Sequence, residues 1–265
     1  MYLFIRIVTV ASAFAWLSCS CCGVAAVEET AAQAFAKMPP RLTATSSASD
    51  VLDACRSMLP SKPVELRGAL ILRNRRGIVS KEFNYALVMR RTREITQMTV
   101  RLFPRDGTNV LVEAFIARRG TARPDITVAS YGEKLAAEPV KGLLDRVMGT
   151  DVTWLDLTFD FLWWQDAAYE DERDGESVHG QKCSVIIVKP SSPVEGLAAV
   201  RLWADKKTGC LMQAEQLDES MKPIRRLWGT RVKKFDGRWM VSVLEVETLG
   251  SRHRTKITVD SLKEP

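Results

Sequence analysis

The chain has 265 residues and a formal net charge of +6, with 46% hydrophobic and 26% charged residues. This is the composition of a soluble protein with a sizeable core, in one large domain or two small ones. Because there are only two histidines, a site built on several histidine ligands is excluded.

The N-terminal segment has the features of an export signal. Arg6 supplies a positive charge, the run from Ile7 to Leu17 is apolar, and Val24-Ala25-Ala26 matches an A-x-A-like cleavage site. We therefore predict a signal peptide over residues 1–26 and an exported, periplasmic protein. An uncleaved N-terminal membrane anchor is the alternative, although the run is shorter than the ~20 residues of a comfortable membrane span.

The cysteines leave two alternatives open. Cys19 follows Leu17-Ser18, one place out of register with a lipoprotein signal, so lipidation of Cys19 is a minority alternative. Beyond residue 26 three cysteines remain, so at least one is unpaired within the chain. A disulfide in an oxidising periplasm and buried free thiols are both compatible with the sequence. The three are Cys55, Cys183 and Cys210, with Cys183–Cys210 as the candidate pair.

Residues 27–48 are rich in Ala, Pro, Ser and Thr and are predicted to be a flexible lead-in. A helix is expected next, capped by Ser49 or Asp50 and ended by Pro60 and Pro63. We place the folded domain at residues 49–265.

From Val64 the apolar residues alternate with polar ones, which is typical of half-buried strands. Asn74–Gly77 and Asp106-Gly107 are turn signals between successive strands. The apolar side chains of these strands share one face of the predicted sheet, and they are the candidate cavity residues. They are Leu70, Leu72, Tyr85, Leu87, Met89, Met98, Val100, Leu102, Val110 and Val112.

The C-terminal third repeats this pattern. Short strands separated by turn signals in an unbroken series indicate antiparallel pairing. The predicted fold is therefore mainly β (α+β): a curled antiparallel sheet that forms an open half-barrel. The expected strands lie near residues 181–189, 199–205, 210–218, 222–234, 238–249 and 253–262.

Between the two β regions lies a predicted lid insertion at about residues 132–176. It begins with Glu138-Pro139 and a short helical stretch through Leu143, Leu144 and Val147. Thr153 and Asp156 then form a capping-box pattern before a helix expected at 154–165. Apolar residues fall on nearly every side of this helix, so both a lid over a cavity and a plain core helix are consistent with it. The lid residues are Trp154, Leu155, Phe159, Leu162 and Trp163.

A large curled sheet with only a few short helices favours an apolar hollow. Burying an acyl chain is worth ~0.8 kcal/mol per methylene, so such a hollow could hold a lipid without special chemistry. An ordinary packed core is the alternative.

The segment from Gly149 to Leu157, GTDVTWLDL, resembles the G-[ST]-D-[FIL]-[ST]-[YW]-x-D-[LM] signature of LolA-like outer-membrane lipoprotein-sorting proteins, in their uncharacterised bacterial branch. Fragments at 64–68, 180–183, 200–206, 236–239 and 254–257 are similar to strands of that branch. The resemblance covers about residues 48–262. It implies an open half-barrel with a helical lid, an apolar ligand cavity and a periplasmic location, with Gly149, Asp151 and Asp156 as motif residues. LolA proper holds its lid closed with an arginine, which the sequence here does not identify.

Catalysis is not expected. Gly175–His179 lacks the last glycine of a G-x-S-x-G nucleophile motif, and His179 with Cys183 lacks further metal ligands. We read Asp151 and Asp156 as a turn and a helix cap rather than as catalytic carboxylates. No enzyme activity, cofactor or metal is therefore predicted.

Charge is unevenly distributed. Residues 67–105 have a local net charge of +8, and residues 151–176 have one of −8. The basic residues alternate with apolar ones, so most are assigned to the solvated face of strands, and nucleic acid is not predicted as a partner. Contact with anionic lipid head groups, contact with an acidic partner, and pairing of the two regions are the other interpretations.

The sequence thus favours a periplasmic carrier or binding protein for lipid or for the acyl chains of lipoproteins, in outer-membrane lipoprotein sorting. The alternative is an envelope interaction or sensor domain on the same fold, which binds lipid or a membrane or envelope protein partner without transport.

Overall fold

The computed structural model describes residues 42–43, 46–92, 94–131, 136–235 and 238–264. The predicted signal peptide, Cys19 and most of the lead-in lie outside these residues. The first half of the described chain contains α2 (Ala48–Ser57), β1 (Val64–Asn74), β2 (Val79–Arg91), β3 (Ile95–Pro104), β4 (Val112–Arg119), β5 (Asp125–Ser130) and β6 (Ala136–Pro139). The second half contains η1 (Val147–Gly149), α3 (Trp154–Thr158), η2 (Asp160–Trp163), β7 (Asp166–Tyr169), η3 (Asp171–Arg173), β8 (Ser177–Val178), β9 (Gln181–Lys189), β10 (Ala199–Asp205), β11 (Leu211–Leu217), β12 (Pro223–Phe235), β13 (Arg238–Thr248) and β14 (His253–Lys263).

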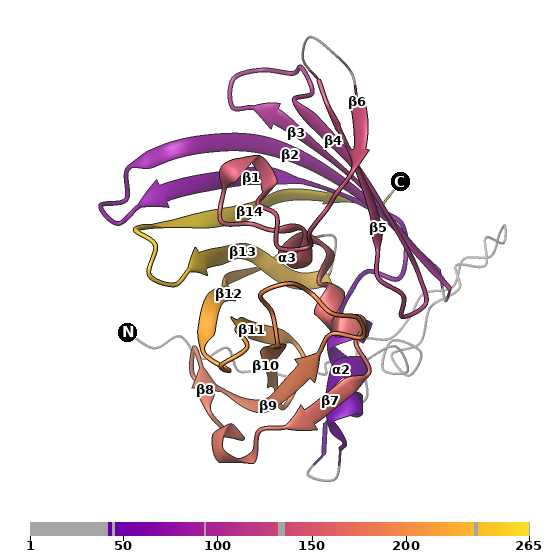
Figure 1. The fold of residues 1–265 in the computed structure, drawn as a ribbon, viewed down its shortest axis with the longest axis vertical. Coiled ribbons are helices and arrows are strands. Elements are labelled where there is room, and N and C mark those ends of the chain that lie inside the picture. Colours follow the sequence, from indigo (N-terminus) through magenta and orange to yellow (C-terminus); the bar gives the residue numbers. More distant parts are fainter. Residues whose placement is uncertain (1–41, 44–45, 93, 132–135, 236–237, 265) are drawn as a thin grey trace, which may run out of the picture. The chain divides into compact units, whose positions relative to one another are not determined.

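The strands form one antiparallel sheet in the order β6-β5-β4-β3-β2-β1-β14-β13-β12-β11-β10-β9-β7, with β8 paired to β9. The first strand β1 pairs with the last strand β14, which joins the two β regions into one sheet. The four-residue strands β6 and β7 form its two edges, so the sheet is not closed into a barrel. Figure 1 shows its curvature, with α3 on the concave side. The predicted fold class is confirmed.

Alternating polarity places most strands correctly. β9 and β10 have the expected bounds, and the other C-terminal strands differ by one or two residues. Every residue of β10 is buried, because its outer face is also covered. There Cys183, Val185 and Trp203 form a small cluster with Val178 of β8, and the Trp203 indole donates to Glu176 (2.9 Å).

Helix α2 begins two or three residues earlier in the sequence than expected. Ser47 is its N-cap and forms a reciprocal capping box with Asp50, whereas Ser49 and Asp50 were the predicted caps. The buried side of α2 contacts β7, β9 and η2.

The predicted helix at 154–165 is wrong in length. α3 ends at Thr158, because Phe159 adopts a left-handed conformation (φ 47°) that cannot continue an α-helix. A 3₁₀ turn over Asp160–Trp163 follows, and Trp164 is extended. The expected helical stretch before it is also wrong, since Glu138-Pro139 belong to β6 and the first helical turn begins only at Val147.

Candidate functional site

Nine of the ten predicted cavity residues lie together on the inner face of β1–β4, and Val110 is the exception. The strand register aligns inner-face residues in rows across the sheet. One row contains Leu66 of β1, Leu87 of β2, Val100 of β3 and Ala114 of β4. Leu87 is half-buried against the main apolar cluster, and Leu72 is buried but outside it. The predicted residues inside that cluster are Leu70, Tyr85, Met89, Met98, Val100, Leu102 and Val112.

Val110 does not belong to this row. It precedes β4, which begins at Val112, and is only half-buried. The backbone leaves the strand here, because Leu111 makes the last contact with β3, through its N–H and the carbonyl of Leu102 (2.8 Å). Leu111 and not Val110 packs against the core at this point.

The segment from Leu143 to Trp164, here called the cover segment, packs on the inner face. Trp154, Leu155, Leu162 and Trp163 belong to the same apolar cluster as the strands, and Phe159 is partly buried against it. In this conformation the predicted lid residues therefore fill the space inside the curve of the sheet. A guest molecule could reach the inner face only if the cover segment moved.

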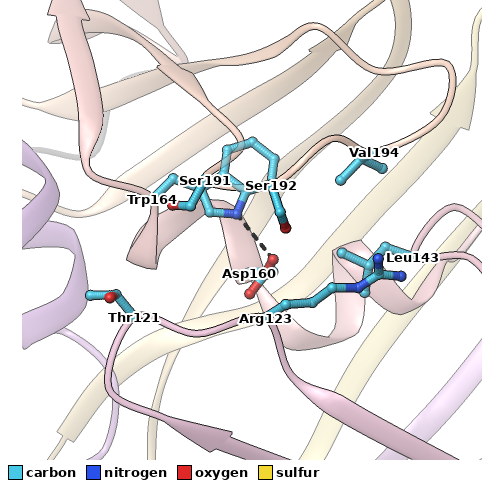
Figure 2. Close-up of a pocket in the computed structure, with 8 residues that line it drawn as sticks. All are labelled: Thr121, Arg123, Leu143, Asp160, Trp164, Ser191, Ser192 and Val194. Atoms are coloured by element: carbon cyan, nitrogen blue, oxygen red, sulfur yellow. Dashed lines mark hydrogen bonds between the residues drawn. The ribbon is translucent and has the colours of Figure 1, made fainter.

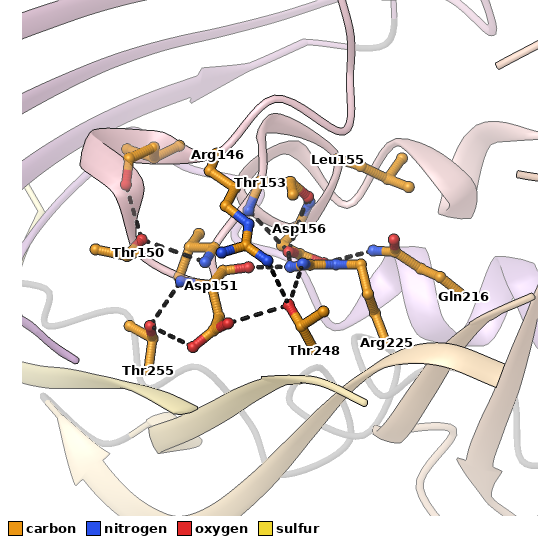
Figure 3. A network of polar contacts seen from close by, with 12 residues as sticks. Arg146, Thr150, Asp151, Thr153, Leu155, Asp156, Gln216, Arg225, Thr248 and Thr255 are labelled. Carbon is orange, nitrogen blue, oxygen red and sulfur yellow. Dashed lines mark hydrogen bonds and ion pairs between the residues drawn. The ribbon is translucent and has the colours of Figure 1, made fainter. Parts of the chain in front are cut away.

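Asp156 joins the cover segment to two strands (Figure 3). Its Oδ2 accepts hydrogen bonds from the backbone N–H and hydroxyl of Thr153 (2.9 and 2.8 Å), which confirms the predicted capping box. The same oxygen pairs with Arg225 of β12 at 2.8 Å, and Oδ1 accepts from the Gln216 amide of β11 at 2.8 Å. One carboxylate thus caps α3 and fixes it to the sheet.

Asp151 makes the matching connection to β13 and β14. Its carboxylate is fully buried and accepts from Thr248 (3.0 Å) and Thr255 (3.2 Å), and it lies 2.9 Å from Nδ1 of His253. Its backbone N–H donates to Thr255 (2.8 Å), and its carbonyl accepts from Arg225. Both motif aspartates are therefore saturated with donors, as structural groups are.

Gly149 sits where the chain turns into the motif. Met148 and Gly149 have positive φ values of 51° and 66°, a conformation that favours glycine. A side chain at Gly149 would also approach the Lys81 ammonium group, which donates to the Met148 carbonyl (3.1 Å). This explains the glycine at the start of the signature.

A second buried ion pair fixes the other end of the cover segment. Arg118 of β4 donates to Asp160 (2.5 Å), and its guanidinium lies 4.1 Å from the ring centre of Trp163. The Trp164 indole donates to the other Asp160 oxygen (3.0 Å). The Arg118 and Asp160 side chains are 3% and 4% exposed, so both charges are removed from water.

Sequence reasoning missed both anchoring arginines. A signal was available for Arg118, because it continues the inward-facing series Val112, Ala114 and Ile116 at a spacing of two. Arg225 likewise is a buried charge within a predicted strand. Pairing of residues 151–176 with residues 67–105 was one of the interpretations left open. The ion pairs of Asp156 and Asp160 do not follow it, because their partners lie on β12 and β4.

A small pocket of about 10 Å³, room for about one water molecule, adjoins this second anchor and is partly open to solvent (Figure 2). Asp160, Trp164 and Leu143 of the cover segment form one side. The β4–β5 turn and the β9–β10 loop form the rest, through Thr121, Arg123, Ser191, Ser192 and Val194.

The pH dependence of stability should report on Asp160. Burial raises the pKa of this carboxyl despite the opposing effect of Arg118, so the folded state favours its protonated form. The buried, protonated Asp160 carboxyl stabilises the fold most at a pH below the pKa of an unfolded aspartate, about 4. This stabilisation is lost as the pH rises through the raised pKa of Asp160 in the folded protein. Urea unfolding from about pH 4 to 7 should show wild type losing stability relative to Asp160→Asn. A constant difference would contradict the raised pKa.

The three described cysteines are free thiols, so the candidate Cys183–Cys210 disulfide is absent from this structure. Burial raises the pKa of Cys55 to about 12 and that of Cys183 to about 11. Burial also raises the pKa of Cys210, but this thiol is partly exposed, so of the three described cysteines it should be the one alkylated by iodoacetamide in the native protein. Peptide mass spectrometry would check this, and labelling of Cys55 at the same rate would contradict the packing of α2.

Three comparisons place the fold among known proteins. A family model described as an uncharacterized protein matches residues 139–264, and no curated protein matches significantly. A DUF1329 family protein from Desulfovibrio piger has a similar structure, with a TM-score of 0.70 and 17% identity over 82% of this chain and 91% of that one. A domain provisionally described as an outer membrane lipoprotein-sorting protein, from Vibrio parahaemolyticus, has a TM-score of 0.70 and 14% identity over the same shares.

A LolA superfamily protein from Nitrosomonas europaea has a TM-score of 0.62 and 14% identity over 83% of this chain and 94% of that one. At these identities the likeness concerns the fold, which is the LolA-type arrangement of a curved, open antiparallel sheet with few helices. Among the described helices none is long and apolar enough to cross a membrane.

Proposed function

We propose that the protein is an exported, periplasmic binding protein or carrier for lipid acyl chains, including those of lipoproteins. The observation that carries the proposal is the inner face of β1–β5, an apolar surface that is interrupted by Arg118 and is covered by the cover segment and not by a long helix. The LolA-type fold supports it.

The cover segment is built as a separable element. Its helical parts η1, α3 and η2 are only three, five and four residues long, and the left-handed Phe159 divides α3 from η2. Polar side chains of β4, β11, β12, β13 and β14 hold it at two points, around Asp151 and Asp156 and around Asp160. Withdrawal of the segment would expose aromatic and aliphatic surfaces, which acyl chains would then cover, at ~0.8 kcal/mol per buried methylene.

We assign no catalytic step to this site. Asp151 and Asp156 each accept several hydrogen bonds, and Asp160 is held by Arg118 and Trp164. These groups have structural partners and no geometry suited to proton transfer toward a substrate.

An envelope interaction or sensor domain is the second candidate. The close packing of Trp154, Leu155 and Leu162 on the inner face favours it, because a domain that never opened would show the same packing.

Native mass spectrometry with lipid extraction, on protein purified from a bacterial periplasm, tests the two candidates. We expect co-purified phospholipid or acylated peptide, and uptake of a fluorescent fatty acid. Leu87→Asp, on the inner face, should abolish both, whereas Val88→Asp, on the opposite face of the same strand, should not. A ligand-free protein that takes up no fatty acid would overturn the carrier proposal and leave the interaction domain.

A further inference from the structure

Two turns lie side by side at one end of the sheet. The β1–β2 turn follows Asn74, and the β13–β14 turn precedes His253, which is the register partner of Asn74. The Arg75 N–H donates to the Arg252 carbonyl (2.8 Å), which joins the two turns directly. Figure 1 shows the turns projecting together, and we call them the paired turns.

The paired turns are strongly basic. Residues 73–81 contain four arginines or lysines and no acid, and residues 249–256 contain three with one histidine and no acid. Lys81 donates to a backbone carbonyl, and Arg254 pairs with Glu245. Exposed guanidinium groups without an acidic partner among the described residues remain on Arg75, Arg76 and Arg252.

Two aliphatic side chains project among these cations. Ile78 is 59% exposed and Val79 is 43% exposed, directly after Arg75-Arg76-Gly77. Together they form a small apolar patch beside the cations. A lipid surface accommodates them, because aliphatic groups can enter the boundary between head groups and acyl chains while flanking cations contact anionic phosphate.

We propose that the paired turns are a docking site for an anionic phospholipid membrane surface. Ile78 and Val79 enter the interfacial layer, and Arg75, Arg76 and Arg252 bind the head-group phosphates. An acidic protein surface would pair with the arginines without requiring Ile78 and Val79, whereas a lipid interface uses both groups. The inference does not depend on the interior holding a lipid.

Cosedimentation of the exported protein with phosphatidylcholine vesicles, with and without phosphatidylglycerol, tests this site. We expect binding to the vesicles that contain phosphatidylglycerol, weakened by salt because the charges are exposed. The double variants Ile78→Ser/Val79→Ser and Arg75→Gln/Arg76→Gln should each weaken binding by about tenfold or more, since each removes one of the two attractive contributions.

Val232→Ser is the matched control. Val232 is a 61% exposed aliphatic residue between Arg231 and Lys233, on the part of β12 that pairs with Val241 and so lies away from the paired turns. It should bind as wild type does. Unchanged fatty-acid uptake in all three variants would separate this result from the proposed function. The docking site is overturned if wild type does not bind, or if only the arginine variant loses binding, which is the result expected of electrostatic adsorption without insertion of Ile78 and Val79.

Discussion

Replacing Arg225 with methionine is expected to lower the free energy of unfolding by about 3–5 kcal/mol, the usual cost of breaking a buried ion pair from one side. Arg225 is 6% exposed and binds both the Asp156 carboxylate and the Asp151 carbonyl. Methionine fills much of the same volume but donates no hydrogen bond. The Asp156 charge would remain buried, with only Thr153 and Gln216 as donors.

Urea unfolding of Arg225→Met beside Arg226→Met provides the measurement. Arg226 is the next residue on β12, but its side chain is 40% exposed and pairs with Glu215 on the other face. Glu215 is buried, but it keeps Arg201 as a partner (3.1 Å) when Arg226 is replaced, so the control should lose less stability than Arg225→Met. Equal losses in the two variants would show that Arg225 does not anchor the cover segment.

Arg118→Met should also be destabilising, by up to about 3–5 kcal/mol, since it leaves the Asp160 carboxyl buried without its cation. Asp160→Leu combined with Arg118→Met is expected to recover this loss. Burial lowers the pKa of Arg118 and raises that of Asp160, which shows that neither charge is fully compensated for leaving water. Apolar replacement of both removes that cost and can leave stability unchanged or increased by about 1–4 kcal/mol.

A thermodynamic cycle of the two single variants and the double variant measures the coupling. Fatty-acid uptake measured on the same proteins then reports how readily the cover segment moves away from the sheet. The single Arg118→Met variant should take up ligand faster, because one of the two attachments is lost. A double variant as unstable as Arg118→Met would show that the pair is net stabilising, contrary to the argument from burial.

Much of the sheet could be predicted from local sequence. The alternation of apolar and polar residues, together with the turn residues, correctly predicted the bounds of β9 and β10. The spacing of Thr153 and Asp156 correctly predicted the start of α3. These features depend on residues within one element. β5 was not predicted, although Ile126 and Val128 alternate with polar residues in the same way.

The attachments of the cover segment could not be predicted, because they depend on which strands become neighbours. Asp156 meets Arg225 and Asp160 meets Arg118 only after the sheet has curved around the segment. The end of α3 also depends on contacts with distant parts of the chain. Phe159 leaves helical geometry, and Asp160 beyond it is bonded to both Arg118 and Trp164. Long-range contacts of this kind override local helix propensity.

The pairing of β1 with β14 determines how the chain can fold. The Ala69 N–H and the Thr258 hydroxyl, 189 residues apart, are joined in the finished sheet. Such a contact cannot form until nearly the whole chain is available, and contacts between distant residues slow folding. Until then β1 has an unpaired edge and the inner face of the first half is uncovered, which are conditions that favour aggregation. A chain exported from its N-terminus would expose these surfaces for the whole of its translocation, so a holding chaperone should increase its yield.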